Sequence, residues 1–273
     1  MEQPVIDCHV HVFDPVRYPY AADAYYVPTR PETGTLEQLQ RTHDVHGVRH
    51  ALLVGPNSGY GEDNRYLLDA LARGADRFRG VAMVPNRATR AELSALRDAG
   101  VLGVTLNAAL LGVECYADAG ELLGALAALD MVADVQVAGD QLSALAPMLA
   151  RSGARILVDH CGRPDPADGL DQPGFRELLD LGRGGRAVVK LSGLVKFSHR
   201  PPPHEDTWPF VRALVDAFGP GRCVWGSDWP FLRSPLRIDY GPLLAQLEEL
   251  VPDSAARRQI LWDTPCREFR FPS

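Results

Sequence analysis

Val5-Ile6-Asp7-Cys8-His9-Val10-His11 is the stretch that decides the fold, an apolar run that ends in two histidines spaced two residues apart. It reads as a short buried strand. Because side chains alternate between the faces of a strand, His9 and His11 point the same way. At the start of a chain in which strands and helices alternate, such a pair suits the inner wall and C-terminal mouth of a parallel barrel. Two neighbouring imidazoles can bind a divalent metal ion, or they can polarise a carbonyl group without one.

Outward from this stretch, apolar runs and helical segments alternate along the whole chain. Strands are expected at Val5–Val10, His50–Val54, Gly80–Val84, Gly103–Leu106, Val132–Val137, Ile156–Asp159, Ala187–Leu191 and Cys223–Gly226. Helices are expected at Thr35–His46, Asp63–Ala75, Ala88–Ala99, Ala117–Leu129, Gln141–Ala150, Gly174–Leu181, Trp208–Phe218 and Tyr240–Leu250. Eight such units predict an α/β fold, a (β/α)8 TIM barrel in which residues 1–273 form a single domain. An open doubly wound sheet would want a glycine-rich turn after its first strand, but the chain continues His-Val-Phe-Asp-Pro.

The composition favours a protein that acts on small molecules. Of 273 residues, 46% are hydrophobic and 23% are charged, with a net charge of −7, which argues against a nucleic-acid partner. No apolar run is long enough to span a bilayer, so no membrane partner is expected. The five cysteines form no paired pattern, which indicates reduced thiols and a cytoplasmic location. Whether the chain forms a homo-oligomer is left open.

Polar residues gather where three further apolar runs end, and catalytic groups of this fold lie at such positions. His160 and Arg163 follow the sixth run, Ser192 follows the seventh, and Asp228 follows the eighth. Together with His9 and His11, His160 and Asp228 are the expected catalytic residues. Lys190 lies inside the seventh strand and should project into the barrel, where a buried ammonium needs a carboxylate partner such as Asp159 or Asp228. Asn57, Ser58 and Tyr60 follow the second strand and are expected to line the pocket.

Four motifs resemble the amidohydrolase superfamily, namely IDCHVHVFDP (6–15), VDHCGRP (158–164), VKLSG (189–193) and VWGSDWP (224–230). Within it they are most similar to the amidohydrolase 2 branch, whose members hydrolyse pyrone dicarboxylate, sulfomuconolactone and sugar-acid lactones. The resemblance implies that Asp228 takes a proton from water while His9, His11 and His160 surround the lactone carbonyl. It also implies that Arg163 grips a substrate carboxylate, and that Lys196 falls where the pyrone enzyme has an arginine.

Two departures from the pyrone enzyme bear on the substrate. That enzyme has an arginine where Thr105 stands and a tyrosine where Ala138 stands, so a smaller or less charged lactone is expected. Specificity should reside in four loops, at residues 13–34, 55–61, 110–116 and 195–205. As a general base, Asp228 should have a pKa that its surroundings raise.

The resemblance also bears on the cofactor. Binuclear members carry a bridging lysine or glutamate on the fourth strand and a histidine on the fifth, and this chain has no histidine between His50 and His160. The lactonases that it resembles work without a metal, so no cofactor is expected. If one divalent ion such as zinc is bound, His9, His11, His160 and Asp228 would be its ligands. Two alternatives remain, a metal-dependent decarboxylase or other mononuclear amidohydrolase, and a barrel that only binds its ligand.

Overall fold

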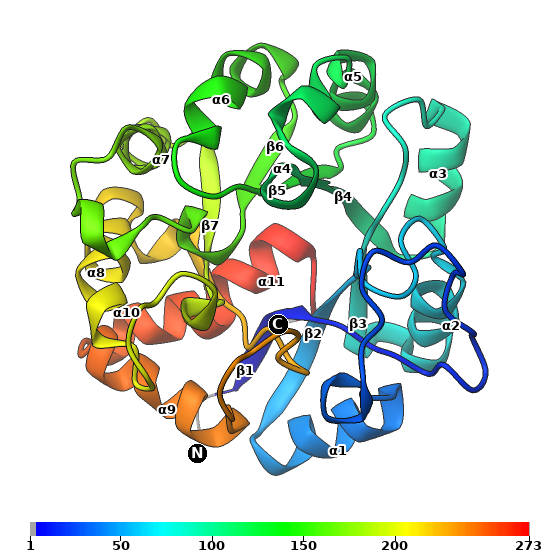
Figure 1. Cartoon of the computed structure of the whole chain (residues 1–273), viewed down its shortest axis with the longest axis horizontal. Coiled ribbons are helices and arrows are strands. Elements are labelled where there is room, and N and C mark those ends of the chain that lie inside the picture. Colours follow the sequence, from blue (N-terminus) through cyan, green and yellow to red (C-terminus); the bar gives the residue numbers. More distant parts are fainter. Residues whose placement is uncertain (1–3, 273) are drawn as a thin grey trace.

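A computed structural model describes residues 4–272 as eight parallel strands surrounded by helices (Figure 1). The strands are β1 (Val5–Val10), β2 (Val48–Val54), β3 (Phe78–Ala82), β4 (Val101–Asn107), β5 (Val132–Gln136), β6 (Arg155–Val158), β7 (Ala187–Leu191) and β8 (Cys223–Trp225). They pair in sequence order, as a chain of right-handed βαβ units requires. The predicted TIM barrel is thereby confirmed.

Helices follow every strand. They are α1 (Leu36–Val45), α2 (Arg65–Gly74), α3 (Arg90–Asp98), α4 (Ala108–Leu111), α5 (Gly120–Ala128), α6 (Gln141–Ser152), α7 (Pro173–Arg183), α8 (Trp208–Phe218), α9 (Tyr240–Leu250), α10 (Ser254–Arg258) and α11 (Thr264–Phe269). The eight predicted helices are all present, within a few residues of their predicted ends. No helix in residues 4–272 combines the length and the apolar character that crossing a membrane needs.

The barrel is nearly closed between its first and last strands. A parallel bridge joins Val10 to Trp229, and His11 N donates to the Trp229 carbonyl at 2.8 Å. One residue earlier, Asp228 N donates to the His9 carbonyl at 2.8 Å. The backbone itself therefore places the aspartate beside both histidines.

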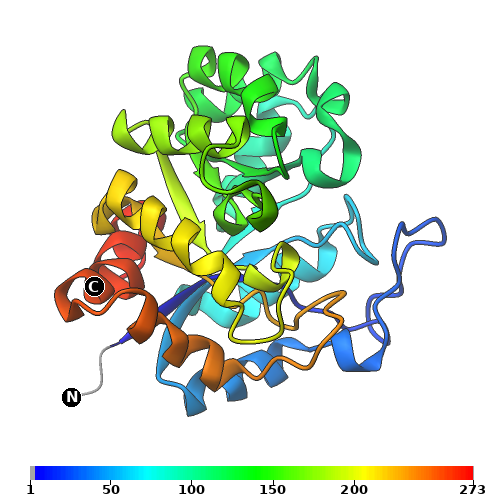
Figure 2. The same cartoon turned by 60° about the vertical axis from the view of Figure 1, so that its left-hand side comes forward.

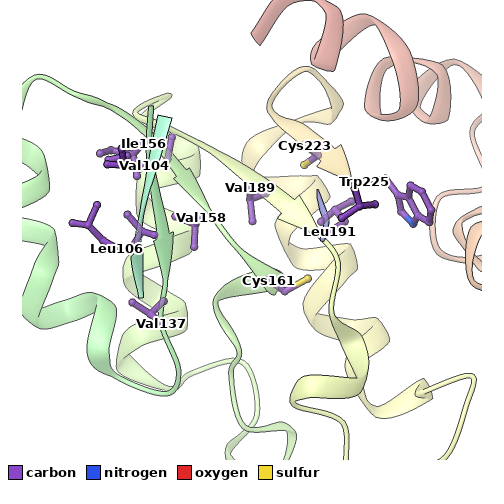
Figure 3. Close-up of a cluster of buried hydrophobic side chains, with 14 of the residues drawn as sticks. Val104, Leu106, Val137, Ile156, Val158, Cys161, Val189, Leu191, Cys223 and Trp225 are labelled. Atoms are coloured by element: carbon purple, nitrogen blue, oxygen red, sulfur yellow. The ribbon is translucent and has the colours of Figure 1, made fainter. Parts of the chain in front are cut away.

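Apolar side chains form two layers, one on each side of the strands. The outer layer packs between strands and helices, and Figure 3 shows part of it, including Val158, Val189 and Leu191. The inner layer fills the barrel and is closed at its base by Phe269, the last residue of α11, and by Phe271. In Figure 2 this red segment lies at the left, while the loops after β1 and β8 extend to the right.

The C-terminal segment α10–α11 was not among the predicted elements. Its sequence is short and rich in arginine, and a π-helical turn at Gln259–Asp263 interrupts its helical periodicity. Its role appears only in three dimensions, because Phe269 is 2% exposed and packs against interior residues of distant strands.

Candidate active site

His9, His11 and Asp228 meet at the C-terminal mouth of the barrel. His9 Nε2 lies 3.3 Å from His11 Nε2, and Asp228 Oδ1 lies 3.7 Å from the first and 3.5 Å from the second. His11 Nδ1 lies 2.8 Å from the Val54 carbonyl, so it carries the proton and leaves Nε2 free toward the aspartate. The two histidines share a face, as predicted.

A buried charged cluster supports His9 from below. Lys190 Nζ lies 2.7 Å from Asp159 Oδ1, 3.0 Å from Asp134 Oδ1 and 3.2 Å from His9 Nδ1. All four side chains are fully buried. Asp159 Oδ2 also lies 3.4 Å from His9 Nδ1 and accepts a hydrogen bond from Gln136. Of the two partners expected for Lys190, Asp159 is the one it contacts.

The two carboxylates of this cluster differ in charge. Burial raises the pKa of Asp134 well above its ordinary value, and the neighbouring Asp159 adds to the rise. Burial acts on Asp159 too, but the Lys190 ammonium and His9 outweigh it and hold its pKa well below the ordinary value. With Asp134 protonated, one positive and one negative charge balance in the interior.

His160 reaches the site from the turn after β6. Its φ is +52°, in the left-handed region, and Asp228 (φ +62°) and Arg163 (φ +45°) share this conformation. Non-glycine residues rarely adopt it outside sites where geometry is imposed. His160 Nδ1 lies 2.9 Å from Ser192 Oγ, and burial together with His9 lowers the pKa of His160 well below its ordinary value. The imidazole is therefore neutral at pH 7.

The pKa of Asp228 moves opposite to the sequence-based expectation. Burial would raise it, but the Lys196 ammonium, 3.2 Å from Oδ2, and the nearby histidines outweigh burial and hold the pKa well below its ordinary value. Lys196 also donates to the Leu232 carbonyl, so its contact with Asp228 is an ion pair more than an aligned hydrogen bond. The expectation that burial or the charge pattern of the site would raise this pKa is wrong, because the nearby charges lower it and outweigh burial.

A cavity of about 490 Å³ opens above these groups. Asn57, Ser58, Arg163 and Lys196 line it, together with His11, His160 and Asp228. Residues from each of the four loops expected to set specificity also line it. A volume of this size suits a small-molecule ligand.

Two of the expected pocket residues lie elsewhere. Lys190 is fully buried beneath His9 and does not line the cavity. Tyr60 is 4% exposed, stacks on Phe13 with ring centroids 5.7 Å apart, and accepts a hydrogen bond from the Asp14 backbone at 2.9 Å. His9 also lies below the cavity, in contact with groups that line it.

Three polar residues that line the cavity were not among the predicted site residues or loops: Asn107, Gln136 and Arg233. Asn107 and Gln136 are the last residues of β4 and β5, so the rule that selected His160 and Asp228 could have found them. Arg233 lies in the long loop after β8, where no strand-end position marks it.

The donor atoms fit one divalent ion. In a tetrahedral zinc site with bonds of about 2.0–2.2 Å, ligand atoms lie about 3.3–3.6 Å apart. The three separations among His9 Nε2, His11 Nε2 and Asp228 Oδ1 are 3.3, 3.5 and 3.7 Å. A second group of donors, His9, Asp159 and His160, is similarly close. These buried groups could therefore hold a metal ion.

Comparison with known proteins agrees with this geometry, because the amidohydrolase family profile matches residues 6–271. The chain belongs to the amidohydrolase family. It is 33% identical to a 4-sulfomuconolactone hydrolase of Rhizobium radiobacter, over 96% of this chain and 89% of that one. It is 31% identical to an L-fucono-1,5-lactonase of Burkholderia ambifaria, over 97% and 95% of the two chains.

A solved structure shares the whole barrel with this amidohydrolase. It is a probable 2-pyrone-4,6-dicarboxylic acid hydrolase of Acinetobacter baumannii with citric acid bound, 27% identical to this chain. The TM-score is 0.89, and the match covers 98% of this chain and 99% of the other. These names confirm the amidohydrolase resemblance found in the four motifs.

Proposed function

We propose that this amidohydrolase hydrolyses a small lactone, opening its ring to a hydroxy acid. One observation carries the proposal: an ionised carboxylate, Asp228, lies beside two imidazoles at the floor of a cavity that cationic side chains line. Lactones are the compounds named for both curated relatives, which supports a cyclic ester as the substrate.

The first step is attack of water on the lactone carbonyl carbon, with Asp228 taking one proton from the water. Because its pKa is low, Asp228 is ionised at neutral pH but is a weak base in the free enzyme. A substrate anion near Lys196 would compete with Asp228 for the ammonium and so weaken the ion pair that lowers the Asp228 pKa. Binding of an anionic substrate would therefore raise the basicity of Asp228 when water is in place.

The oxyanion that forms needs a hydrogen-bond donor. If the Ser192 hydroxyl donates to His160 Nδ1, Nε2 carries the proton and can donate into the cavity that His160 lines. Such a donor is typically worth about 10²–10³ in rate. The ring C–O bond then breaks, and Asp228 returns its proton to the leaving alkoxide.

In this proposal Lys190 does not contact the substrate and acts through His9. When its ammonium donates to His9 Nδ1, the His9 proton lies on Nε2 and points to His11 Nε2, 3.3 Å away. The buried cluster would thus fix the tautomer of the histidine pair. Arg163, Asn57 and Ser58 would hold the substrate, with the planar guanidinium suited to a carboxylate or sulfonate.

A divalent ion is the second possibility for the same donors. His9, His11 and Asp228 would hold it, with His160 close by, and when bound it would supply Lewis-acid polarisation of a carbonyl group. The roles of Arg163 in binding and Ser192 in orienting His160 would be unchanged. The metal-independent route is proposed because Lys190 and Lys196 already place positive charge beside His9 and Asp228.

The test is acid release in a pH-stat from a panel of muconolactones, sugar-acid lactones and pyrone carboxylates, with metal analysis of the purified protein. Release that survives chelation, at well under one metal per chain, would support the metal-independent route. Activity that disappears with chelator and returns with Zn²⁺ would assign the donors to a metal. Absence of ring opening across the panel, with decarboxylation of an unsaturated acid instead, would overturn the lactonase proposal.

A further inference from the structure

The charge of the cavity is opposite to that of the protein. The whole chain carries −7, yet Arg163, Lys196 and Arg233 line the cavity with Asp228 as the one carboxylate among the lining residues. Low-dielectric walls strengthen the field of such a cluster and favour an anionic ligand. The question is which of the three cations is free to bind it.

Lys196 is already neutralised by Asp228, whose Oδ2 lies 3.2 Å from the ammonium. Arg163 is different. Within residues 4–272 the Arg163 guanidinium forms no ion pair with a carboxylate, and its buried Nε has no hydrogen-bond partner. Burial lowers the pKa of Arg163, attraction to Asp228 and Asp159 offsets part of that effect, and the like charge of Arg233 makes a smaller lowering contribution. A largely buried guanidinium that forms no ion pair and faces a cavity is the expected form of an anion site.

Arg233 lies in the loop after β8, where contacts with the loop after β1 hold it. Its guanidinium carbon lies 5.8 Å and 5.6 Å from the ring centroids of Tyr25 and Tyr26, and Nη1 donates to the Tyr25 hydroxyl at 3.1 Å. Its backbone N donates to Glu32 Oε1 at 2.6 Å. Figure 2 shows these blue and orange segments side by side at the right.

The Arg233 guanidinium keeps an uncompensated charge despite these contacts. Glu32 meets the Arg233 backbone, and its other oxygen accepts from Tyr26 at 2.5 Å, so the carboxylate forms no ion pair with the guanidinium. Arg233 is exposed and Arg163 is largely buried, which places them at the outer and inner ends of one cavity.

We infer that Arg233 forms a second anion subsite at the outer end of the cavity, so that this amidohydrolase takes a lactone with two anionic groups. Arg163 holds the inner group and Arg233 the outer one, and this inference rests on the proposed function for the ring between them. It replaces the expectation, drawn from Thr105, of a less charged substrate: the second cation comes from a loop instead of β4.

Binding without turnover tests the subsite. Adipate and hexanoate have the same six-carbon chain, but adipate carries two carboxylates and hexanoate carries one. Both chains are flexible, so the comparison does not depend on a particular distance between the two anionic groups. Calorimetric titration of the wild-type protein should give adipate a Kd at least about tenfold lower than hexanoate. In Arg233→Gln, adipate should weaken to the level of hexanoate, while hexanoate itself changes less than about twofold.

The matched control is Arg237→Gln, since Arg237 lies in the same loop, is exposed, and pairs with Asp239 at 2.9 Å outside the cavity. It should leave both Kd values unchanged. Equal affinity of the wild-type protein for the two acids, or an adipate preference that survives in Arg233→Gln, would overturn the subsite. This titration measures binding without ring opening, so it tests the subsite independently of lactone hydrolysis. A protein that opens lactones but shows no adipate preference would overturn the subsite alone. A protein that prefers adipate through Arg233 but opens no lactone would overturn the proposed function alone.

Discussion

At the scale of single residues, Asp228 carries the greatest chemical demand. In the proposed mechanism it accepts a proton and later returns it, although Lys196 and the surrounding histidines stabilise its ionised form. Burial lowers the pKa of His9 and of His160, which favours the neutral form of these two imidazoles. An ionised Asp228 beside neutral His9 and His160 favours base chemistry at neutral pH.

Asp228→Asn should lower kcat by about 10²–10⁴-fold, because the amide cannot take the proton of the attacking water. The measurement is initial-rate acid release on a lactone that the wild-type protein opens, with circular dichroism to show that the variant is folded. Asp180→Asn changes an exposed aspartate paired with Arg183 on α7, and it should stay within about twofold of the wild-type rate. Turnover of Asp228→Asn at the wild-type rate would contradict the mechanism.

The pH profile follows from the directions of the pKa shifts. A lowered pKa means that a group keeps its deprotonated form as pH falls, and this holds for Asp228, His160 and His9. We therefore expect kcat/KM to show no acidic limb at the ordinary histidine pKa of about 6.5 and to fall only at lower pH. An acidic limb centred near pH 6.5, the ordinary histidine value, would show that a histidine of the free enzyme titrates normally.

At the scale of elements, the short turns after the strands determine the site more than the strands do. Gly193, after β7, has a φ of +61°, and a Cβ at that position would lie 2.5 Å from His160 Nδ1. This glycine leaves room for the histidine that Ser192 holds. The strands could be predicted from apolar runs, whereas this approach between two turns depends on the closed barrel.

Gly193→Ala should lower kcat by about tenfold or more, since displacing a catalytic group by even about 1 Å is costly. Gly47→Ala is the matched control, because Gly47 also has a positive φ (+69°) but has no atom within 4 Å of an added Cβ. Both variants should lose about 1–2 kcal/mol of stability from the left-handed backbone. Only Gly193→Ala should lose activity per folded molecule, and equal activity in the two variants would contradict the positioning of His160 by this turn.

At the scale of the whole molecule, the barrel separates stability from chemistry. Phe269 and Phe271 close the base of the inner apolar layer, and the charged cluster around Lys190 lies between that layer and the mouth. The base can therefore be weakened without touching the residues that line the cavity.

Phe269→Ala should lower the free energy of unfolding by about 3–5 kcal/mol, because it leaves a cavity at a fully packed site. Urea denaturation measures the loss, and kcat of the folded fraction at low temperature should stay near the wild-type value. Leu170→Ala, at a position that is 40% exposed, should change stability by less than about 0.5 kcal/mol. A small loss in Phe269→Ala would mean that α11 is not an essential part of the barrel core.

The sequence by itself determined the barrel and the residues His9, His11, His160 and Asp228. Apolar runs and strand ends are local features, and in a parallel barrel every strand end arrives at the same mouth. Four motifs in order then identified the family. Asn107 and Gln136 lay within reach of the same reasoning, since they too end strands.

Only the tertiary structure decided the charges and the outer end of the cavity. The pKa of Asp228 depends on the balance between burial and a lysine 32 positions away in the chain, which no local pattern contains. Arg233 reaches the cavity because Tyr25, Tyr26 and Glu32 of another loop hold it there. Electrostatic effects sum over all neighbours in space, so they could be read only after the chain had folded.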